Sequence, residues 1–439
     1  MFNIPKLAAL IFILLLMAGC AKTAMPTPAP ATETPPLPTA TAVPTLTATL
    51  PEATPRSQRP LLMAHYMPWY QTPDISGYWG WHWTMNHFDP AQTDENGRPQ
   101  IASHYMPLTG PYDSMDDALL EYQVLLMKMS GIDGVIVDWY GSEDFWDYGV
   151  LNQATGKLFK YVRQAGLRFA ICYEDQTVKH MVDNQHLSRA DVYTHGQEVM
   201  RYLQNTWFGD DAYLKTAGRP VLLTFGPQYY INATDWEKLF SVLDVQPAFI
   251  TLDKRLGTVA LSSYPWPPMW ASKDGVLTQA ALENYLNQFY AQVSGDAYIV
   301  GGAFPQFHDI YKEAGVSEGY GRLEAQDGET FQLTLDLALS HNPDVIQLIT
   351  WNDYGEGTSI EPTEEFGYRY LELVQETRRT MTDGDFTFTA ADLRLPLQLL
   401  TLRRQYADDA GVNGRLDEAC AALIAGDVQG ATAILTDYR

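Results

Sequence analysis

The stretch VIQLITWNDYGEG, residues 345–357, begins as a continuous apolar run and ends in polar and flexible residues. Continuous apolar runs are typical of parallel strands that are buried on both faces, whereas half-exposed antiparallel strands alternate. The polar ending places Asp353 and Glu356 directly after the run. The stretch therefore predicts a parallel strand whose carboxyl end leads into a loop that carries chemistry.

The same arrangement recurs along the chain. Eight apolar runs are strand candidates, at residues 61–70, 134–141, 168–175, 220–230, 247–253, 259–266, 298–307 and 345–357. Helical patterns separate most of them, such as residues 114–131, which have Asp near the start and Gly at the end as caps. Strands that alternate with helices predict a parallel sheet, and eight units predict a closed (β/α)8 barrel in the α/β class.

The barrel prediction is weakest between the fifth and sixth strands. The connecting sequence KRLGT, residues 254–258, is too short for a helix, so an open doubly wound sheet is the alternative fold. No Gly-rich phosphate loop follows the first strand, which counts against nucleotide-binding open sheets. Residues 391–439 form a short helical C-terminal extension in this prediction, packed outside the barrel without chemistry of their own.

The N-terminus predicts export. In residues 1–19 a single Lys6 precedes a short apolar run that ends in small residues, as in a secretory signal. The segment Met17–Cys20 resembles a bacterial lipoprotein signal, in which Cys20 is lipidated; the alternative is an ordinary signal with an incidental cysteine. Residues 20–59 are rich in Pro, Thr and Ala and predict a disordered tether. We therefore expect an extracytoplasmic barrel, residues 60–390, lipid-anchored at the bacterial cell envelope.

Charge and cysteine usage exclude several classes of function. The formal net charge is -24 and no basic cluster interrupts it, which argues against nucleic acid or anionic lipid as a partner. Cys172 and Cys420 lie too far apart in sequence for a disulfide framework or a metal finger. The histidines are scattered, so we expect no metal site, and no G-x-S-x-G elbow follows a strand, which argues against a Ser-His-Asp hydrolase. We also expect no cofactor and a monomeric protein.

Polar and aromatic residues gather at the ends of the predicted strands. In a barrel these ends converge on one face, where active sites are built. Aromatic rings bind the C–H faces of sugar rings, and polar side chains bind the hydroxyl groups. These residues predict a glycan-binding cleft; the alternative is that the tryptophans fill the barrel mouth as core. The expected substrate-binding residues are His65, Tyr66, Trp69, Tyr70, Trp81, His82, Asp138, Trp139, Tyr140, Glu174, Tyr229, Gln306, His308, Trp351 and Asn352.

The pair Asp353 and Glu356 fits the needs of glycoside hydrolysis. One carboxylic acid protonates the leaving oxygen, and a second carboxylate activates the nucleophile. The glycines at 355 and 357 let the backbone turn so that both side chains face inward. Because the acid has to hold its proton near neutral pH, one of the two should have a raised pKa.

Four segments carry a resemblance to a known family: HYMPWY, HYMPLTGPYDS, GIDGVIVDWYG and TWNDYGEGTSIEP. Over roughly residues 61–380 the chain resembles glycoside hydrolase family 99 and its relative, family 71. The resemblance implies a (β/α)8 glycosidase acting on α-mannan, as an endo-acting and retaining enzyme. It also implies that Glu356 is the acid/base and that Asp353 corresponds to a glutamate that assists the sugar's 2-hydroxyl group.

The catalytic segment departs from the family pattern N-E-W-H-E-G, since Asp replaces the first Glu and Tyr-Gly replaces Trp-His. Asp353 is shorter by one C–C bond, roughly 1.5 Å, which leaves room for the water that inverting enzymes use. The spelling WNDYGE is closer to family 71 α-1,3-glucanases, so α-mannan and α-glucan, and retention and inversion, stay open. The alternative functions are a non-catalytic glycan-binding lipoprotein and a barrel protein of polysaccharide assembly, which the export signal disfavours.

Overall fold

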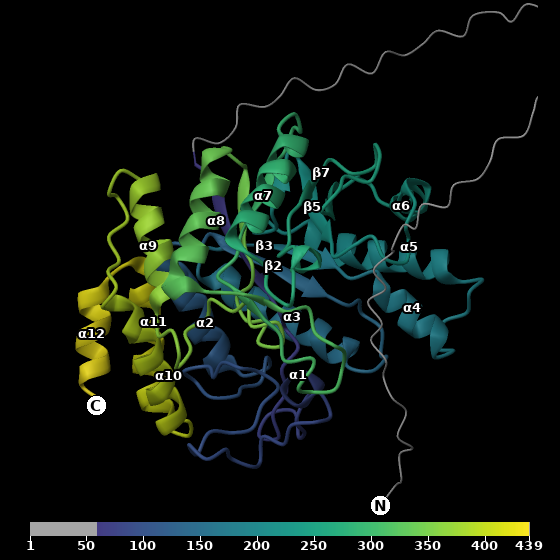
Figure 1. Ribbon diagram of the computed structural model, residues 1–439. Helices are drawn as coiled ribbons and strands as arrows, with labels where there is room; N and C mark the ends of the chain where they lie inside the picture. Colours follow the sequence, from purple (N-terminus) through teal and green to yellow (C-terminus); the bar gives the residue numbers. More distant parts are fainter. Residues whose placement is uncertain (1–58, 439) are drawn as a thin grey trace, which may run out of the picture. The chain divides into compact units, whose positions relative to one another are not determined.

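Eight parallel strands form the centre of the molecule, as predicted. The computed structural model describes residues 59–438, so the predicted signal, Cys20 and most of the tether lie outside the described residues. The strand order is β7-β6-β5-β3-β2-β1-β11-β8, and β7 lies beside β8, so the sheet nearly closes into a barrel (Figure 1). The strands are β1 (Leu61–Tyr66), β2 (Gly134–Trp139), β3 (Arg168–Tyr173), β5 (Arg219–Thr224), β6 (Ala248–Leu252), β7 (Ser262–Tyr264), β8 (Val300–Ala303) and β11 (Val345–Leu348).

The helices mostly cover the outside of this sheet, except the four-residue α1, which lies in the long loop after β1. They are α1 (Trp81–Thr84), α2 (Asp117–Ser130), α3 (Tyr148–Gln164), α4 (Gln176–Asp183), α5 (Val192–Leu203), α6 (Ala233–Phe240), α7 (Gln279–Val293), α8 (Glu329–Ser340) and α9 (Arg369–Met381). The C-terminal extension adds α10 (Leu395–Gln405), α11 (Ala410–Ala425) and α12 (Val428–Thr436). Figure 1 shows these last helices, in yellow, on one side of the barrel, and α10 packs against α2. The (β/α)8 barrel with C-terminal helices is thus confirmed.

Local sequence explains where these elements begin and end. Asp116 caps α2 by accepting a hydrogen bond from the backbone N–H of Ala118, and Gly131 ends the helix in the left-handed conformation that glycine tolerates. No helix separates β6 from β7 in the described chain, as the short KRLGT connection predicts. Among the residues that the structure describes, no helix has both the length and the apolar character to cross a membrane.

Short additional strands and loops decorate the barrel. β4 (Lys215–Thr216) pairs antiparallel with β5, and β9 (Phe307–His308) pairs antiparallel with β10 (Arg322–Leu323). The predicted strands ran past the real ones at their carboxyl ends, because β1 stops at Tyr66 and β11 at Leu348. Most of the polar and aromatic residues that we singled out therefore lie in loops. In a loop, unlike a strand, successive side chains need not point to opposite faces of the sheet.

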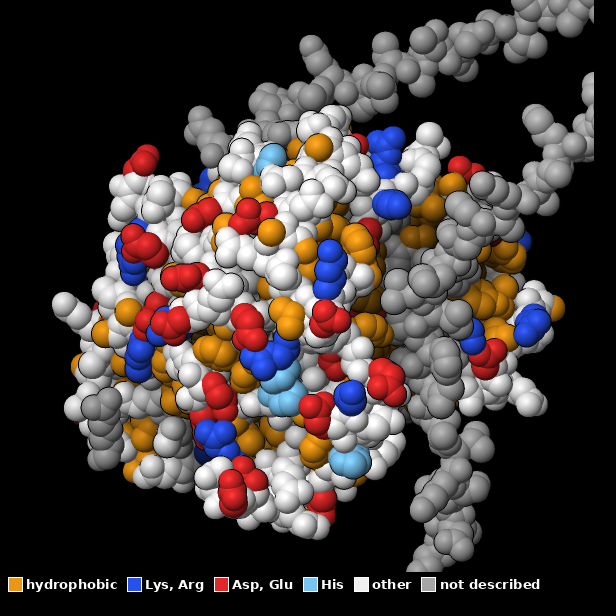
Figure 2. All heavy atoms as spheres, viewed as in Figure 1, with side chains coloured by type: hydrophobic (Ala, Val, Ile, Leu, Met, Phe, Trp, Pro, Cys, Tyr) orange, Lys and Arg blue, Asp and Glu red, His pale blue; other side chains and the backbone are white. Residues whose placement is uncertain are grey.

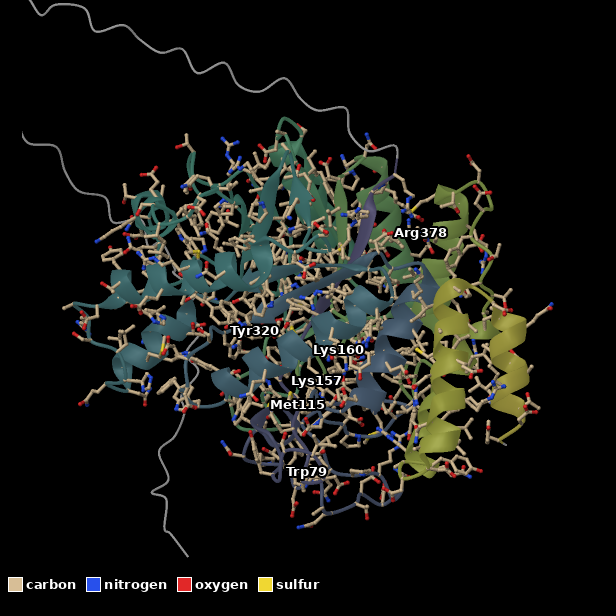
Figure 3. The ribbon with its side chains drawn as sticks, turned by 180° about the vertical axis from the view of Figure 1, so that it is seen from behind. Trp79, Met115, Lys157, Lys160, Tyr320 and Arg378 are labelled. Atoms are coloured by element: carbon tan, nitrogen blue, oxygen red, sulfur yellow. The ribbon has the colours of Figure 1, made fainter. Side chains whose placement is uncertain are left out.

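One buried cation ties α9 to the amino ends of the strands. Arg378 is 2% exposed; its Nε donates to the backbone oxygen of Gly131 at 2.8 Å, and its guanidinium pairs with Asp133 at 2.5 Å. Asp133 also accepts a hydrogen bond from the backbone N–H of Leu62 at the start of β1. In Figure 3, Arg378 and Trp79 lie toward opposite ends of the barrel. The ion pair therefore stabilises the end that is away from the long loop after β1.

Replacing Arg378 by Met should destabilise the domain by about 3 kcal/mol, because the change leaves Gly131 and Asp133 without their buried donor. Urea unfolding measures this loss. As a control, Arg415→Met removes a half-exposed pair with Glu418 and should cost no more than about 1 kcal/mol. Equal and small losses for the two variants would show that the buried pair adds no stability.

Candidate active site

The side-chain amide of Asn352 helps to fix the loop after β11 to the loop after β1. Asn352 accepts a hydrogen bond from the backbone N–H of Met67 at 2.8 Å and donates to the backbone oxygen of Met67 at 3.0 Å. Its Nδ2 also donates to the Tyr112 hydroxyl at 3.0 Å. The hydroxyl of Tyr70 donates to the backbone oxygen of Asn352 at 2.8 Å. These buried contacts set the position of the two carboxylates that follow in the sequence.

Asp353 and Glu356 lie in the tight turn that follows. The backbone N–H of Glu356 donates to Asp353 Oδ1 at 2.9 Å, and the backbone N–H of His308 donates to the backbone oxygen of Glu356 at 2.8 Å. Gly357 has a φ of +65°, and a Cβ there would lie 2.6 Å from the backbone oxygen of His308. Only glycine fits both the backbone conformation and the close approach. The turn is therefore built to hold these two side chains against the segment after β8.

Four carboxyl groups from three strand ends converge here: Asp138, Glu174, Asp353 and Glu356. Burial raises the pKa of Asp138 well above its usual range, and the charges of Glu174 and Asp353 raise it further. Burial and the charges of Asp175 and Asp353 raise the pKa of Glu174 to about 8. Like charges in a water-poor site cannot all ionise at neutral pH, so part of this cluster holds protons.

The two candidate catalytic carboxyls differ in pKa for a structural reason. Burial raises the pKa of Asp353 to about 6, while hydrogen bonds from the backbone N–H groups of Glu356 and Gly355 limit the rise. Burial and the charge of Asp353 raise the pKa of Glu356 well above its usual range, against a lowering hydrogen bond from the Trp266 side chain. Glu356 Oε2 is buried and has no hydrogen-bond partner. Near neutral pH the arrangement thus favours an ionised Asp353 beside a protonated Glu356.

An aromatic wall lies beside the carboxyl cluster. The rings of Trp69 and His82 stack with centroids 4.1 Å apart and an interplanar angle of 5°, and Trp69 lies 6.0 Å from Tyr140. After burial, the charges of Glu174 and Asp138 have the largest effects in raising the pKa of Tyr140, which places this ring next to them. Trp69 Nε1 is buried without a partner. The wall offers the apolar surface and the free donor that a sugar ring needs.

The segment after β8 also contributes polar side chains near the carboxyl pair. His308 stacks on His104 with ring centroids 3.7 Å apart, and its Nδ1 lies 3.2 Å from the Tyr105 hydroxyl. Gln306 is 2% exposed, and its Oε1 accepts from the same hydroxyl at 3.4 Å. Burial lowers the pKa of His308 to about 4, so this ring is neutral at physiological pH. It therefore offers a hydrogen-bond donor and acceptor, and no positive charge.

Several expected binding residues serve the scaffold. Trp139 is fully buried, with Nε1 donating to Asn152 of α3, because side chains on a barrel strand alternate between interior and helices. Tyr66 likewise donates to Gln123 of α2 at 2.7 Å. Tyr70, Trp351 and Asn352 are also buried. These five side chains are therefore part of the packed interior. They hold the strands, helices and loops that position the site.

The remaining expected residues have mixed positions. Tyr229 is partly exposed, in a loop held by the buried Asp175, whose carboxylate accepts from the backbone N–H groups of residues 228 to 230. Trp81 is partly buried and packs on a small cluster that includes Met85 and Ile310. His65 points into the barrel and is 0% exposed. The structure therefore brings His65 close to the carboxyl cluster, while Tyr229 and Trp81 have no contact with the catalytic pair among those described.

Sequence reasoning missed three aromatic residues of the site. Trp266, after β7, hydrogen bonds to Glu356, and the charge of Glu356 is the largest effect after burial on the pKa values of Tyr311 and Tyr320. Tyr320 is labelled in Figure 3. The strand-end rule, applied to the run at residues 259–266, would have found Trp266. Tyr311 and Tyr320 lie in a long loop that carries no such signal.

The face of the domain in Figure 2 mixes acidic, basic and apolar side chains. No single basic surface dominates this face, in keeping with the net charge of -24.

Comparison with known proteins agrees with this geometry. No family model matches the chain. It is 22% identical over 318 residues to a glycoprotein endo-alpha-1,2-mannosidase-like protein of Danio rerio, covering 67% of this chain and 69% of that protein. It is 21% identical over 322 residues to glycoprotein endo-alpha-1,2-mannosidase of Mus musculus, covering 68% and 67%. A GH99 endo-alpha-mannosidase from Bacteroides thetaiotaomicron superposes with a TM-score of 0.56 and 18% identity, over 75% of this chain and 99% of that one.

The chain thus resembles the endo-α-1,2-mannosidases in sequence and a GH99 endo-α-mannosidase in fold. The resemblance expected from the sequence motifs is thereby confirmed, and the solved structure supports the barrel fold.

The raised pKa of Glu174 predicts how stability depends on pH. The folded protein keeps this proton up to about pH 8, whereas the unfolded chain loses it near pH 4.5, so stability falls as pH rises between these values. For one extra proton held by the folded protein, the free energy of unfolding falls by at most about 1.4 kcal/mol per pH unit. We expect Glu174→Gln to melt at a higher temperature than the wild type at pH 8, with the gap closing toward pH 4.5.

Thermal melts of both proteins across this range measure the effect. Glu237→Gln, at an exposed position of α6, is the matched control and should follow the wild type at every pH. A Glu174→Gln curve parallel to the wild-type curve would show that Glu174 is ionised in the folded protein.

Proposed function

We propose that the chain is a glycosidase that hydrolyses α-linked glycans, with Glu356 as the general acid and Asp353 as the second carboxylate. The observation that carries the proposal is the pair of buried carboxyls with separated pKa values in one turn after β11. The relationship to endo-α-1,2-mannosidases supports α-mannosides as the substrate class.

The geometry suggests how the two groups divide the work. Protonated Glu356 has a buried oxygen without a partner and a hydrogen bond to Trp266, so it is oriented to give its proton to a glycosidic oxygen. Asp353 is ionised above about pH 6, and two backbone N–H groups fix its carboxylate. In that state it accepts a proton, either from the sugar's 2-hydroxyl group or from a water. The first route retains the anomeric configuration and the second inverts it.

The residues around the two carboxyls would bind the glycan and take no part in proton transfer. Trp69, stacked on His82, offers an apolar face, and His308 and Gln306 offer polar atoms from the segment after β8. The uncharged state of His308 suits hydroxyl groups better than carboxylates or phosphates. These features support a neutral glycan as the ligand.

The first test is hydrolysis followed by proton NMR with α-mannan and, separately, α-1,3-glucan. We expect cleavage of α-mannan, because the relatives named above are mannosidases. The anomer that appears first reports the route: the α-anomer for the 2-hydroxyl route and the β-anomer for attack by water. Cleavage of the glucan alone would contradict the mannoside proposal. Binding of either glycan without any cleavage would favour a non-catalytic glycan-binding protein.

Replacing Glu356 by Gln removes the proposed acid. We expect kcat on a glycan to fall about 10²–10⁴-fold, with a smaller loss on an aryl glycoside whose leaving group needs no proton. In the wild type, kcat/KM should rise as pH increases through about 6, where Asp353 ionises, and this rise should persist in the variant.

The exposed Glu237→Gln change is the control and should leave both constants unchanged. Turnover near the wild-type level for Glu356→Gln on a poor leaving group would assign the acid to another residue, and the neighbouring Glu174 and Asp138 would be the next to test.

We also propose that the domain is exported and anchored through Cys20, as the N-terminal sequence suggests. This proposal rests on residues 1–59 of the sequence alone. A tethered enzyme at the cell envelope would meet polymeric glycans outside the cell, which agrees with the proposed substrate class.

A further inference from the structure

A second cluster of chemical groups lies in the barrel interior: His65 of β1, Asp138 of β2 and Cys172 of β3. One ligand atom from each, a ring nitrogen, a carboxylate oxygen and a sulfur, lies within 4.8 Å of the other two. His65 and Cys172 are 0% exposed and Asp138 is 3% exposed. The mechanism proposed above uses neither His65 nor Cys172.

The register of the sheet explains this convergence. Asp138 and Cys172 are direct partners on neighbouring parallel strands, so their side chains project to the same face. His65 is the partner of Ile136, which is two residues before Asp138 and therefore shares its face. Three adjacent strands thus direct three different donor atoms into one part of the interior.

The cluster lacks the partners that buried polar groups normally have. Neither ring nitrogen of His65 has a hydrogen-bond partner, although Gln347 lies near the ring, and Asp138 Oδ1 has none either. Cys172 Sγ lies 3.5 Å from the Tyr264 hydroxyl, which itself donates to the backbone oxygen of Thr224. An unpartnered imidazole and carboxylate oxygen, both buried, cost stability unless a ligand can satisfy them.

We propose that His65, Asp138 and Cys172 form a binding site for one borderline-soft divalent cation such as Zn²⁺. Nitrogen, oxygen and thiolate sulfur are the donors that this ion prefers, and three protein ligands leave a fourth position open. Since Asp138 belongs both to this trio and to the carboxyl cluster, the ion would share Asp138 with that cluster. Binding releases the Cys172 thiol proton to solvent, because the ligand is the thiolate.

Cobalt provides a direct probe, because Co²⁺ bound to a thiolate gives a near-ultraviolet charge-transfer band. The chain contains three cysteines, so the experiment uses the full chain with Cys20→Ser as its parent. We expect one Co²⁺ per chain, a thiolate band, and displacement by Zn²⁺. Cys172→Ser should abolish the band. Cys420→Ser is the matched control, since that thiol lies apart on α11, and it should keep the band unchanged.

A second variant covers the case in which Cys172→Ser fails to fold. His65→Gln keeps the thiol but removes a nitrogen ligand. Removing a residue that hydrogen bonds to a metal ligand typically weakens binding about 10–100-fold. Removing the ligand itself should weaken Co²⁺ binding by at least as much. Absence of the band in the parent, its loss in Cys420→Ser, or unchanged affinity in His65→Gln would each overturn the proposal. The readout is binding alone, so it is independent of whether the chain hydrolyses glycans.

Discussion

Crowding of carboxyl groups away from water is the constraint on which the active end of this barrel depends. Asp138, Glu174 and Glu356 each have a pKa that is raised by burial and by the charge of another member of the group. A cluster of this kind is costly to ionise, so protons remain on some of its members at neutral pH. The site thereby stores acid groups in a pH range where free Glu and Asp would be ionised.

Hydrogen bonding decides which member gives up its proton first. Asp353 receives two backbone N–H groups from its own turn, which stabilise its charged form, whereas one oxygen of Glu356 is buried without a partner. A difference of this kind separates an acid from a base when both have similar side chains. The position of this loop depends on Asn352, which hydrogen bonds to the Met67 backbone, and on Gly357, which allows a close approach to the backbone oxygen of His308. The scaffold residues near the site thus act on its chemistry through geometry.

The sequence predicted the barrel well because buried parallel strands leave a strong local signal. Each of the eight apolar runs contains a strand, and even the missing helix between β6 and β7 was visible in the short connection. The convergence of Asp138, Glu174, Asp353 and Glu356 followed from one rule about strand ends. The rule failed for Tyr66 and Trp139, because consecutive residues of a strand point to opposite sides and both sides are apolar in a barrel.

Other features had no local signal at all. His65, Asp138 and Cys172 are far apart in sequence, and only the register between β1, β2 and β3 brings them together. Tyr311 and Tyr320 approach Glu356 from a loop whose path depends on tertiary contacts. Sequence spacing reports on ligands within one helix or turn, so a site assembled across strands escapes it. This is why the spacing of the histidines gave no indication of the proposed cation site.

The two ends of the barrel resolve the same physical problem in opposite ways. At the amino ends of the strands, Arg378 and Asp133 pair with each other and with backbone groups, so their charges are matched within the protein, although Arg378 Nη1 has no hydrogen-bond partner. At the carboxyl ends, Glu356 Oε2 and Trp69 Nε1 remain buried without partners. An unmatched buried polar atom lowers stability, but it gains a hydrogen bond when a ligand hydroxyl arrives. At the carboxyl ends the unpartnered atoms belong to candidate site residues, so a polar ligand bound there would satisfy them, and the ion pair at the amino ends helps to offset their cost.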